Sequence, residues 1–304
     1  MLQRAVELAE RGRGTTHPNP VVGAVVVRDG DVIGEGWHER KGGPHAEVVA
    51  LGDAGDTARG ATLYVTLEPC DHHGTTPPCV DAILAAGITK VVVGAKDPTR
   101  EGIARLREDG VEVELVDFWP ARAQIEAWLT WARLGRPFVT YKAAVTLDGR
   151  MTVPGRRWVS GEASRRVVHE LRAASDAVAV GMGTVRADDP RLDAREVEVV
   201  RQPRRLAFGR GPLPDGSDLE LLSGPLDEEL RRLAAENVQS LLLESGPTLA
   251  SAFFEADLVD KVLFFLAPAV SGSGPRLSVQ AALTRPSARA VGDDVLLTAY
   301  VHEP

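Results

Sequence analysis

Hydrophobic and polar positions in residues 1–134 alternate between helical and strand patterns. Residues 2–11 place apolar side chains three to four positions apart, which predicts an amphipathic helix. The apolar runs at 21–27 and 32–37, separated by a short polar turn, predict a β-hairpin. The other expected elements are a helix from about 45, a strand at 61–67, a helix at 79–86, a strand at 88–95, a helix and strand ending near 116, and a helix at 123–134. This alternation predicts a mostly parallel sheet covered by helices.

A second series of strands and helices begins after Gly135-Arg136-Pro137. Glycine and proline end the preceding helix there and a new β run follows at once, so we expect two domains, 1–135 and 136–304. The segment from Gly209 to Gly224, rich in Gly, Pro and Asp, is expected to be a loop. The elements expected in this half are strands at 138–147, 176–182, 205–208, 259–268 and 294–301, helices at 163–173 and 228–235, and a strand-turn-helix unit at 240–256.

The composition narrows the class of protein. With 44% apolar and 26% charged residues, the chain resembles an average soluble globular protein. Its net charge of -8 argues against a nucleic-acid partner held by phosphate contacts. The longest apolar run, 262–270, is far shorter than the roughly 18 residues of a membrane span, and the first residues lack a secretory apolar core. We therefore expect a cytoplasmic protein, in which two cysteines are more typical of a metal site than of a disulfide.

Three residues in two short segments have the character of zinc ligands. A catalytic zinc site has three protein ligands and keeps a fourth position for water, whose pKa the metal lowers. His45, Cys70 and Cys79 supply that number, each at or next to an expected helix start, where a thiolate is favoured. Glu47, two residues after His45, is placed to shuttle protons beside the metal. This H-x-E and P-C arrangement is typical of zinc nucleobase deaminases, although eight residues separate the cysteines here instead of two.

Other interpretations of these residues stay open at this point. A structural zinc site would have four protein ligands, and His72 or His73 is available as the fourth. The two cysteines are also compatible with buried thiols that bind no metal.

Longer motifs around these residues resemble a known family. They are HPNPVVGAVV from His17, GWHERKGGPHAE from Gly36 and LEPCDHHGTTPPC from Leu67. Nearly the whole chain resembles the bifunctional deaminase/reductase family of bacterial riboflavin biosynthesis. The resemblance implies an α/β protein with an N-terminal cytidine-deaminase-like three-layer domain and a C-terminal dihydrofolate-reductase-like domain.

The resemblance also implies roles for residues of the first domain. His45, Cys70 and Cys79 are then the ligands of one zinc ion per chain, and Glu47 is the catalytic proton donor. Asn19 and His38 are then expected to contact the substrate. From the residues alone, an Asn between two prolines is also compatible with a plain turn residue.

For the second domain the resemblance implies reduction by NADPH. The motifs are KAAVTLDGR from Lys142, WVSG from Trp158, GMGTVRADDPRL from Gly181 and LLLESGPTLASAF from Leu241. The implied substrate-binding residues are Lys142, Arg172, Leu192, Arg195 and Glu244. The implied cofactor-binding residues are Ala144, Trp158, Thr184, Asp188, Gly246, Pro247 and Thr248. Independently, a buried strand that turns through Gly246 into a helix start predicts an anion site suited to a cofactor phosphate.

The residues to which the resemblance gives roles in the second domain are also compatible with purely structural positions. Arg172 is compatible with a solvated helix face, Trp158 with a core position, and Asp188 with a plain turn.

The sequence departs from the family pattern at three places. Thr99 stands where the family usually has Asn, FGRG from Phe208 replaces an acidic residue after the strand, and Ser245 replaces the first glycine of E-G-G. These departures from the family pattern bear on the cofactor preference and the efficiency of the reductase more than on the deaminase.

The expected function is deamination of a diaminopyrimidinone ribosyl 5-phosphate, followed by reduction of its ribosyl group to ribityl. The expected partners are this small phosphorylated pyrimidine and further copies of the chain, as a homodimer or homotetramer, with no nucleic acid and no membrane. The alternatives are a zinc deaminase with an impaired or altered reductase domain, a deaminase of another base with a silent second domain, a non-enzymatic zinc scaffold, and a reductase whose first domain only docks partners.

Overall fold

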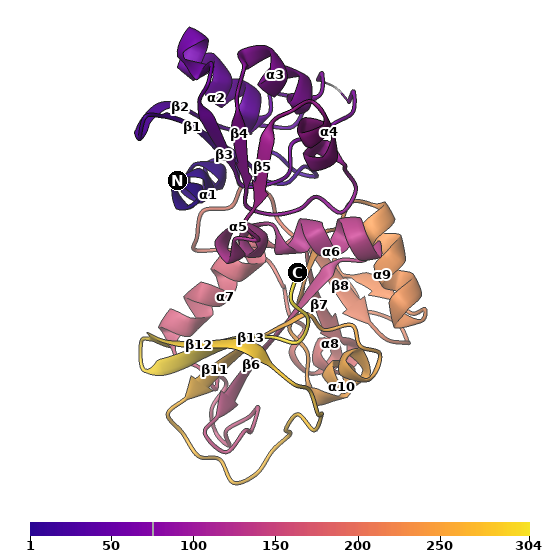
Figure 1. Ribbon diagram of the computed structural model, residues 1–304. Helices are drawn as coiled ribbons and strands as arrows, with labels where there is room; N and C mark the ends of the chain where they lie inside the picture. The colour runs from indigo at the N-terminus through magenta and orange to yellow at the C-terminus, as the bar shows by residue number, and fades with distance from the viewer. Residues whose placement is uncertain (75) are drawn as a thin grey trace. The chain divides into compact units, whose positions relative to one another are not determined.

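The computed structural model describes residues 1–74 and 76–304 and divides into two compact units (Figure 1). The first comprises residues 1–134 together with Pro304, and the second comprises residues 135–303. The chain thus passes from one unit to the other at Gly135.

Within its described residues, the first unit contains a five-stranded sheet of order β2-β1-β3-β4-β5. β1 runs antiparallel to β2 and β3, while β3, β4 and β5 are parallel. The strands are β1 (Gly23–Arg28), β2 (Asp31–Trp37), β3 (Thr62–Val65), β4 (Lys90–Val93) and β5 (Glu112–Leu115). The helices are α1 (Leu2–Glu10), α2 (Ala46–Ala54), α3 (Cys79–Ala86), α4 (Gly102–Glu108), α5 (Trp119–Gln124) and α6 (Glu126–Leu134), with a 3-10 turn at Gly55–Ala58.

Strand alternation divides the apolar residues of this sheet between two helical layers. Ala24 and Val26 of β1 belong to the core shared with α2, α3 and α4, whereas Val25 packs against α1. The side of α1 also includes apolar residues of α6 such as Leu129. This is the expected three-layer arrangement, and it leaves the starts of α2 and α3 side by side at one end of the sheet (Figure 1).

A glycine in β2 determines how closely α2 approaches the sheet. A Cβ atom on Gly36 would lie 2.6 Å from the carbonyl oxygen of Ala46, in the first turn of α2. Only a residue without a Cβ permits this contact of backbone with backbone. The position of the α2 start, where His45 is the N-cap, therefore depends on Gly36.

In the second unit, the described residues form an eight-stranded sheet of order β12-β13-β11-β6-β10-β7-β8-β9. Strands β11, β6, β10, β7, β8 and β9 run parallel, and β13 and β12 add an antiparallel edge. The strands are β6 (Phe138–Thr146), β7 (Ala177–Gly181), β8 (Arg204–Phe208), β9 (Glu220–Leu222), β10 (Ser240–Leu243), β11 (Lys261–Ala267), β12 (Thr284–Val291) and β13 (Asp294–Tyr300). The helices are α7 (Glu162–Ala174), α8 (Met182–Asp188), α9 (Leu226–Ala235) and α10 (Pro247–Glu255).

Helices cover both faces of this sheet. Leu230 of α9 and Phe253 of α10 pack with Leu241 and Leu243 on one face. Val185 of α8 packs with Leu242 on the opposite face, which α7 also covers. A parallel strand that is buried on both faces needs a nearly continuous run of apolar residues, and the LLL sequence of β10 is such a run.

Elements at four places differ from the sequence-based expectations, and one of them is the helix α8, which was not expected. Residues 209–224, expected to be a loop, include the short strand β9. β12 contains Pro286 and exposes seven of its eight residues, so it lacks an alternating pattern, and its place at the sheet edge explains why proline is tolerated. The expected helix at 123–134 is two helices, α5 and α6.

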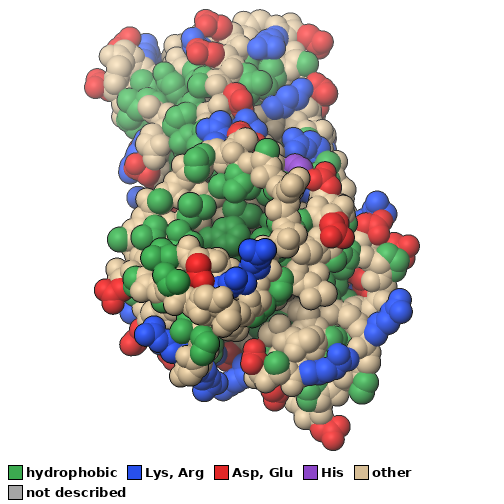
Figure 2. All heavy atoms as spheres, turned by 90° about the horizontal axis from the view of Figure 1, so that it is seen from below, with side chains coloured by type: hydrophobic (Ala, Val, Ile, Leu, Met, Phe, Trp, Pro, Cys, Tyr) green, Lys and Arg blue, Asp and Glu red, His purple; other side chains and the backbone are tan. Residues whose placement is uncertain are grey.

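The surface carries charges of both signs. In the view of Figure 2, acidic and basic side chains are interspersed, with hydrophobic atoms gathered between them. This face therefore presents no extended field of one sign. None of the helices in the described part of the chain has the length and apolar character needed to cross a membrane.

Candidate functional site

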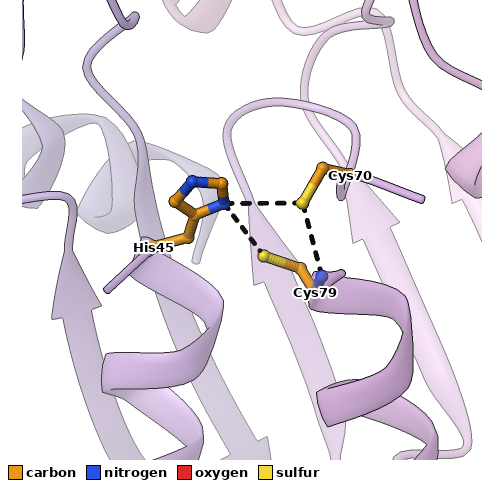
Figure 3. A group of neighbouring side chains, drawn as sticks. All are labelled: His45, Cys70 and Cys79. Atoms are coloured by element: carbon orange, nitrogen blue, oxygen red, sulfur yellow. Dashed lines mark hydrogen bonds between the residues drawn. The ribbon is translucent and has the colours of Figure 1, made fainter. Parts of the chain in front are cut away.

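His45, Cys70 and Cys79 point toward one another at the end of the first sheet (Figure 3). His45 precedes α2, Cys70 follows β3, and Cys79 is the first residue of α3. The Nδ1 atom of His45 lies 3.2 Å from the Sγ atom of Cys79 and 3.5 Å from that of Cys70. All three ligand atoms lie within 4.8 Å of one another.

This donor set fits a tetrahedral zinc ion. Bond lengths of about 2.1 Å to nitrogen and about 2.3 Å to sulfur place tetrahedral ligand atoms roughly 3.6 to 3.8 Å apart. The observed distances are close to these values before any metal draws the ligands together. Among the described residues the cluster has three members, and His72 and His73 are exposed outside it. Three ligands leave a coordination position for water, as in catalytic sites.

Cys70 and Cys79 hold one proton as a pair, because the pKa of Cys70 is lowered and that of Cys79 is raised. The Cys79 thiol beside Cys70, together with His45 and the backbone N–H of Cys79, lowers the pKa of Cys70 to about 4. The same Cys70 thiolate and burial raise the pKa of Cys79. Binding of a divalent cation to both sulfurs therefore releases the Cys79 proton.

Glu47 is the titratable group next to this cluster. It lies in the first turn of α2, is 3% exposed, and is not one of the three members of the described cluster. Burial raises the pKa of Glu47 to about 6. A carboxyl group with such a pKa accepts and returns protons efficiently near neutral pH.

Asn19 and His38 form a hydrogen-bonded pair beside the cluster. The rings of His38 and His45 pack edge to face, 5.3 Å apart. The Nδ1 atom of His38 lies 3.0 Å from the carbonyl oxygen of Pro44, which only accepts, so Nδ1 carries the proton. Burial lowers the pKa of His38 and keeps the ring neutral, so its Nε2 accepts from the Asn19 amide nitrogen at 3.3 Å. This leaves the Asn19 side-chain oxygen as the acceptor for another group.

The backbone of Asn19 takes part in a turn as well. Its N–H donates to the carbonyl oxygen of Thr16 at 2.9 Å. Asn19 can therefore be both a turn residue and a candidate substrate contact, because the turn uses its backbone and the candidate site uses its side chain.

In the second unit, Lys142, Arg172 and Glu244 form a buried ionic cluster. Glu244 follows β10, Lys142 lies on β6, and Arg172 is in the last turn of α7. The Glu244 carboxylate lies 3.4 Å from the Lys142 Nζ atom, and 2.5 and 3.1 Å from Arg172 Nε and Nη2. Burial opposes ionisation of Glu244, but the two cations outweigh it and hold its pKa below the ordinary value. Arg172 is 14% exposed and so does not lie on a solvated face.

The loop at 190–195 brings the other substrate candidates to this cluster. The Nη1 atom of Arg172 donates to the carbonyl oxygen of Asp193 at 3.1 Å, and Arg195 donates to the Asp193 side chain at 2.7 Å. Leu192 is 2% exposed within the core against α8, so its side chain is unavailable to a substrate and only its backbone remains a candidate.

Sequence reasoning missed His169, one turn before Arg172 on α7. It is 8% exposed, and burial together with Arg172 and Arg195 lowers its pKa. Its spacing of three residues from Arg172 on an expected helix is the signal that could have found it.

The expected cofactor residues lie mostly at the carboxyl ends of parallel strands. Thr184 and Asp188 belong to α8, which follows β7. Gly246 is the N-cap of α10, and Pro247 and Thr248 are in its first turn, directly after β10. A Cβ on Gly183 or Gly246 would meet nothing within 4 Å, so the backbone is open at both helix starts.

The remaining cofactor candidates lie elsewhere in the same unit. Ala144 is on β6, and Trp158 is 53% exposed between the guanidinium groups of Arg157 and Arg165, so it is not a core residue. Ser245, the departure from E-G-G, is buried, and its hydroxyl has no hydrogen-bond partner among the described residues.

Comparisons with known proteins match both units of the chain. Family models match residues 1–95, "Cytidine and deoxycytidylate deaminase zinc-binding region", and residues 137–297, "RibD C-terminal domain". The riboflavin biosynthesis protein RibD of Aquifex aeolicus is 39% identical over 311 residues, covering 90% of this chain and 87% of the relative. A solved structure of Acinetobacter baumannii RibD has 35% identity and a TM-score of 0.86, covering 98% of this chain and 97% of that chain.

A second solved structure matches the chain to the same extent. It is a diaminohydroxyphosphoribosylaminopyrimidine deaminase/5-amino-6-(5-phosphoribosylamino)uracil reductase from Thermotoga maritima, with 35% identity and a TM-score of 0.84. The match covers 98% of this chain and 97% of that chain. By this similarity over both units, the chain belongs to the RibD family of riboflavin biosynthesis proteins.

Proposed function

We propose that the chain is a bifunctional enzyme of riboflavin biosynthesis. Residues 1–135 deaminate a diaminopyrimidinone ribosyl 5-phosphate, and residues 136–304 reduce the ribosyl group of the product to ribityl. The observation that carries the proposal is the three-ligand cluster of His45, Cys70 and Cys79 beside the buried Glu47, in a chain that matches RibD proteins over both units.

In the deaminase, His45, Cys70 and Cys79 would hold one zinc ion. When bound, zinc polarises a water molecule and lowers its pKa toward neutrality. Glu47 would take one proton from that water and deliver it to the ring nitrogen. It would then carry the second proton, from the hydroxyl that has added to the ring carbon, to the amino group. The new C–O bond replaces the C–N bond, and ammonia leaves. A pKa of about 6 suits Glu47 to both transfers.

Asn19 and His38 would orient the pyrimidine. His38 occupies the Asn19 amide nitrogen, so the free side-chain oxygen of Asn19 accepts a hydrogen bond from an N–H or amino group of the ring. The fixed tautomer of His38 keeps Asn19 in this orientation.

In the reductase, Lys142, Arg172 and Glu244 would bind and orient the sugar. The net change adds a hydride to C1′, breaks the bond between C1′ and the ring oxygen, and adds a proton to that oxygen. NADPH supplies the hydride when bound. Lys142 is the proton donor of this group, because a guanidinium keeps its protons at neutral pH. Arg172 and Arg195 would bind the 5-phosphate, since Arg172 has five N–H donors and uses three of them within the protein.

The alternative of an impaired reductase has less support. The Lys142, Arg172 and Glu244 cluster is complete, and Gly246 still caps α10 next to Ser245. We further propose that the enzyme acts as a homo-oligomer, a dimer or a tetramer.

A coupled assay on the purified protein tests the proposal. Zinc content is measured first, then ammonia release and NADPH oxidation with the diaminopyrimidinone ribosyl phosphate as substrate. One zinc per chain with equal amounts of ammonia and oxidised NADPH is the expected result. Zinc and ammonia without NADPH oxidation would favour the impaired reductase, and zinc without ammonia would favour a non-enzymatic scaffold.

A further inference from the structure

Glu68 is a buried carboxylate two residues before Cys70. It is 4% exposed, and both of its oxygen atoms accept hydrogen bonds from backbone N–H groups. The donor to Oε1 is Ile103 at 2.8 Å, and the donor to Oε2 is Asp97 at 3.2 Å. A carboxylate is costly to bury unless such donors replace its water. The proposed deamination assigns proton transfer to Glu47 and no step to Glu68, so the place of Glu68 in the fold calls for another explanation.

The first turn of α4 is capped by Glu68, which lies outside the helix. Glu101, the N-cap residue, makes no side-chain cap bond within the described part of the chain. Ile103 is the second residue of α4, and its N–H is one of the backbone donors at a helix start that have no partner inside the helix. The positive end of the helix dipole also favours a carboxylate at this place. Glu68 therefore joins the start of α4 to the chain segment that leads into Cys70.

The start of α4 also contacts the backbone beside Cys70. A Cβ atom on Gly102, the first residue of α4, would lie 1.9 Å from the carbonyl oxygen of Pro69. Only a residue without a Cβ permits this approach. On the other side of Cys70 in the sequence, the Nη1 atom of Arg105 in α4 lies 3.5 Å from the carbonyl oxygen of Asp71. The helix α4 therefore contacts the chain immediately before and immediately after this ligand.

Cys70 in turn contacts the first residues of α3, where Cys79 lies. The backbone N–H of Cys79 donates to Cys70 Sγ at 3.3 Å, and that of Val80 donates to the Cys70 carbonyl oxygen at 3.2 Å. A displacement of Cys70 would therefore change the distance between the two sulfur ligands. We propose that Glu68 is a positioning residue of the metal site: by holding the start of α4 against Pro69, it keeps Cys70 in place to bind the ion together with Cys79. This inference rests on the metal site of the proposed deaminase.

Replacement of zinc by Co²⁺ in the full-length protein tests this role without any turnover. Co²⁺ accepts the same tetrahedral thiolate ligands, and its absorption bands report their geometry. Glu68→Gln keeps the side-chain shape and one acceptor oxygen, but its NH₂ group faces one of the two N–H donors. We expect the thiolate-to-cobalt band to shift or weaken, and competition with a chelator to show zinc bound at least about tenfold more weakly than in wild type.

Asp294→Asn is the matched control, because Asp294 is a buried carboxylate that supports a helix start in the second unit. It is 2% exposed, and it accepts from the backbone N–H of Gly161 at 2.8 Å and from the hydroxyl of Ser164 at 2.6 Å, at the start of α7. The cobalt spectrum and the zinc affinity of this variant should equal those of wild type.

The possible outcomes separate the inference from the proposed function. A folded Glu68→Gln protein with the cobalt spectrum and zinc affinity of wild type would overturn the inference, as would an equal change in both variants. Circular dichroism checks folding, and sucrose, which favours the folded state, is added to all samples if the variant is unstable. If wild type binds neither zinc nor cobalt, the proposed deaminase fails and takes the inference with it. If wild type binds zinc but releases no ammonia, the proposed function fails while the cobalt spectra still decide the role of Glu68.

Discussion

At the residue scale, the zinc ligands could be predicted because their spacing and residue types carry the chemistry. His45, Cys70 and Cys79 lie within 34 positions of sequence and meet in space. The ionic pair of Arg172 and Glu244 spans 72 positions, and no local pattern reveals that these side chains meet. Arg172 was expected to bind the substrate, and its contacts with Glu244 and Asp193 became visible only in the fold.

Glu47→Gln tests whether a proton carrier stands beside the metal. The amide occupies the same volume but cannot carry a proton, so we expect zinc content to be unchanged and ammonia release to fall by at least about 100-fold. Reduction of the already deaminated substrate should continue. Glu108→Gln, at an exposed position of α4, is the control and should behave like wild type. Deamination that survives in Glu47→Gln would assign proton transfer to another group.

Glu244→Gln tests the charge balance of the second cluster. Removing the carboxylate leaves two buried cations without a counter-charge, which costs on the order of 3 kcal/mol of unfolding free energy at neutral pH. The pKa of Glu244 is lowered from the ordinary 4.5, so its contribution to stability is present above pH 4.5 and is lost as the pH falls through the folded-state pKa.

Urea unfolding at several pH values measures this effect. The difference between wild type and Glu244→Gln should be largest at neutral pH and shrink below pH 4.5. A difference that stays constant on acidification would mean that Glu244 is not ionised in the folded protein. Ammonia release in the variant at neutral pH should match wild type.

At the element scale, prediction succeeded where local residues mark both ends of an element. The helix α3 has the predicted bounds, Cys79–Ala86, because Pro78 precedes it and Gly87 follows it with φ +72°. The helix α8 was not predicted, because seven residues with two buried apolar positions give too short a periodic pattern. β12 was missed since pairing with β13, and not its own composition, makes it a strand.

Gly36→Ala tests how β2 positions the start of α2. The added methyl group would lie 2.6 Å from the carbonyl oxygen of Ala46, so the helix start with His45 must shift. We expect a loss of roughly 1 to 3 kcal/mol of unfolding free energy. Zinc should dissociate faster during dialysis against a chelator.

Gly52→Ala, on the helix α2 that Gly36 contacts, is the matched control. A Cβ at Gly52 meets nothing within 4 Å, and alanine favours the helix by up to about 1 kcal/mol. This variant should be as stable as wild type or more so, with unchanged zinc retention. If both variants lose zinc equally, the close approach of β2 to α2 is not what positions His45.

At the scale of the whole molecule, the chain separates into two units with different chemistry. Glycine and proline at 135–137 could predict the break, because they end a helix just before a new strand. Strand order could not be predicted, since it depends on pairings between distant segments, such as β10 inserted between β6 and β7. What each unit can do chemically still follows from residues within that unit.

Chelation of zinc should therefore affect one activity and leave the other. All three ligands belong to the first unit, so metal binding adds its free energy to the folding of that unit alone. Dialysis against a chelator should abolish ammonia release and lower the melting temperature of the first unit. NADPH oxidation with deaminated substrate, and the melting of the second unit, should stay as they were. Calorimetry and both assays on the same samples measure this, and readdition of zinc is the control. A parallel loss of NADPH oxidation, restored by zinc, would mean that the second unit depends on the metal state of the first.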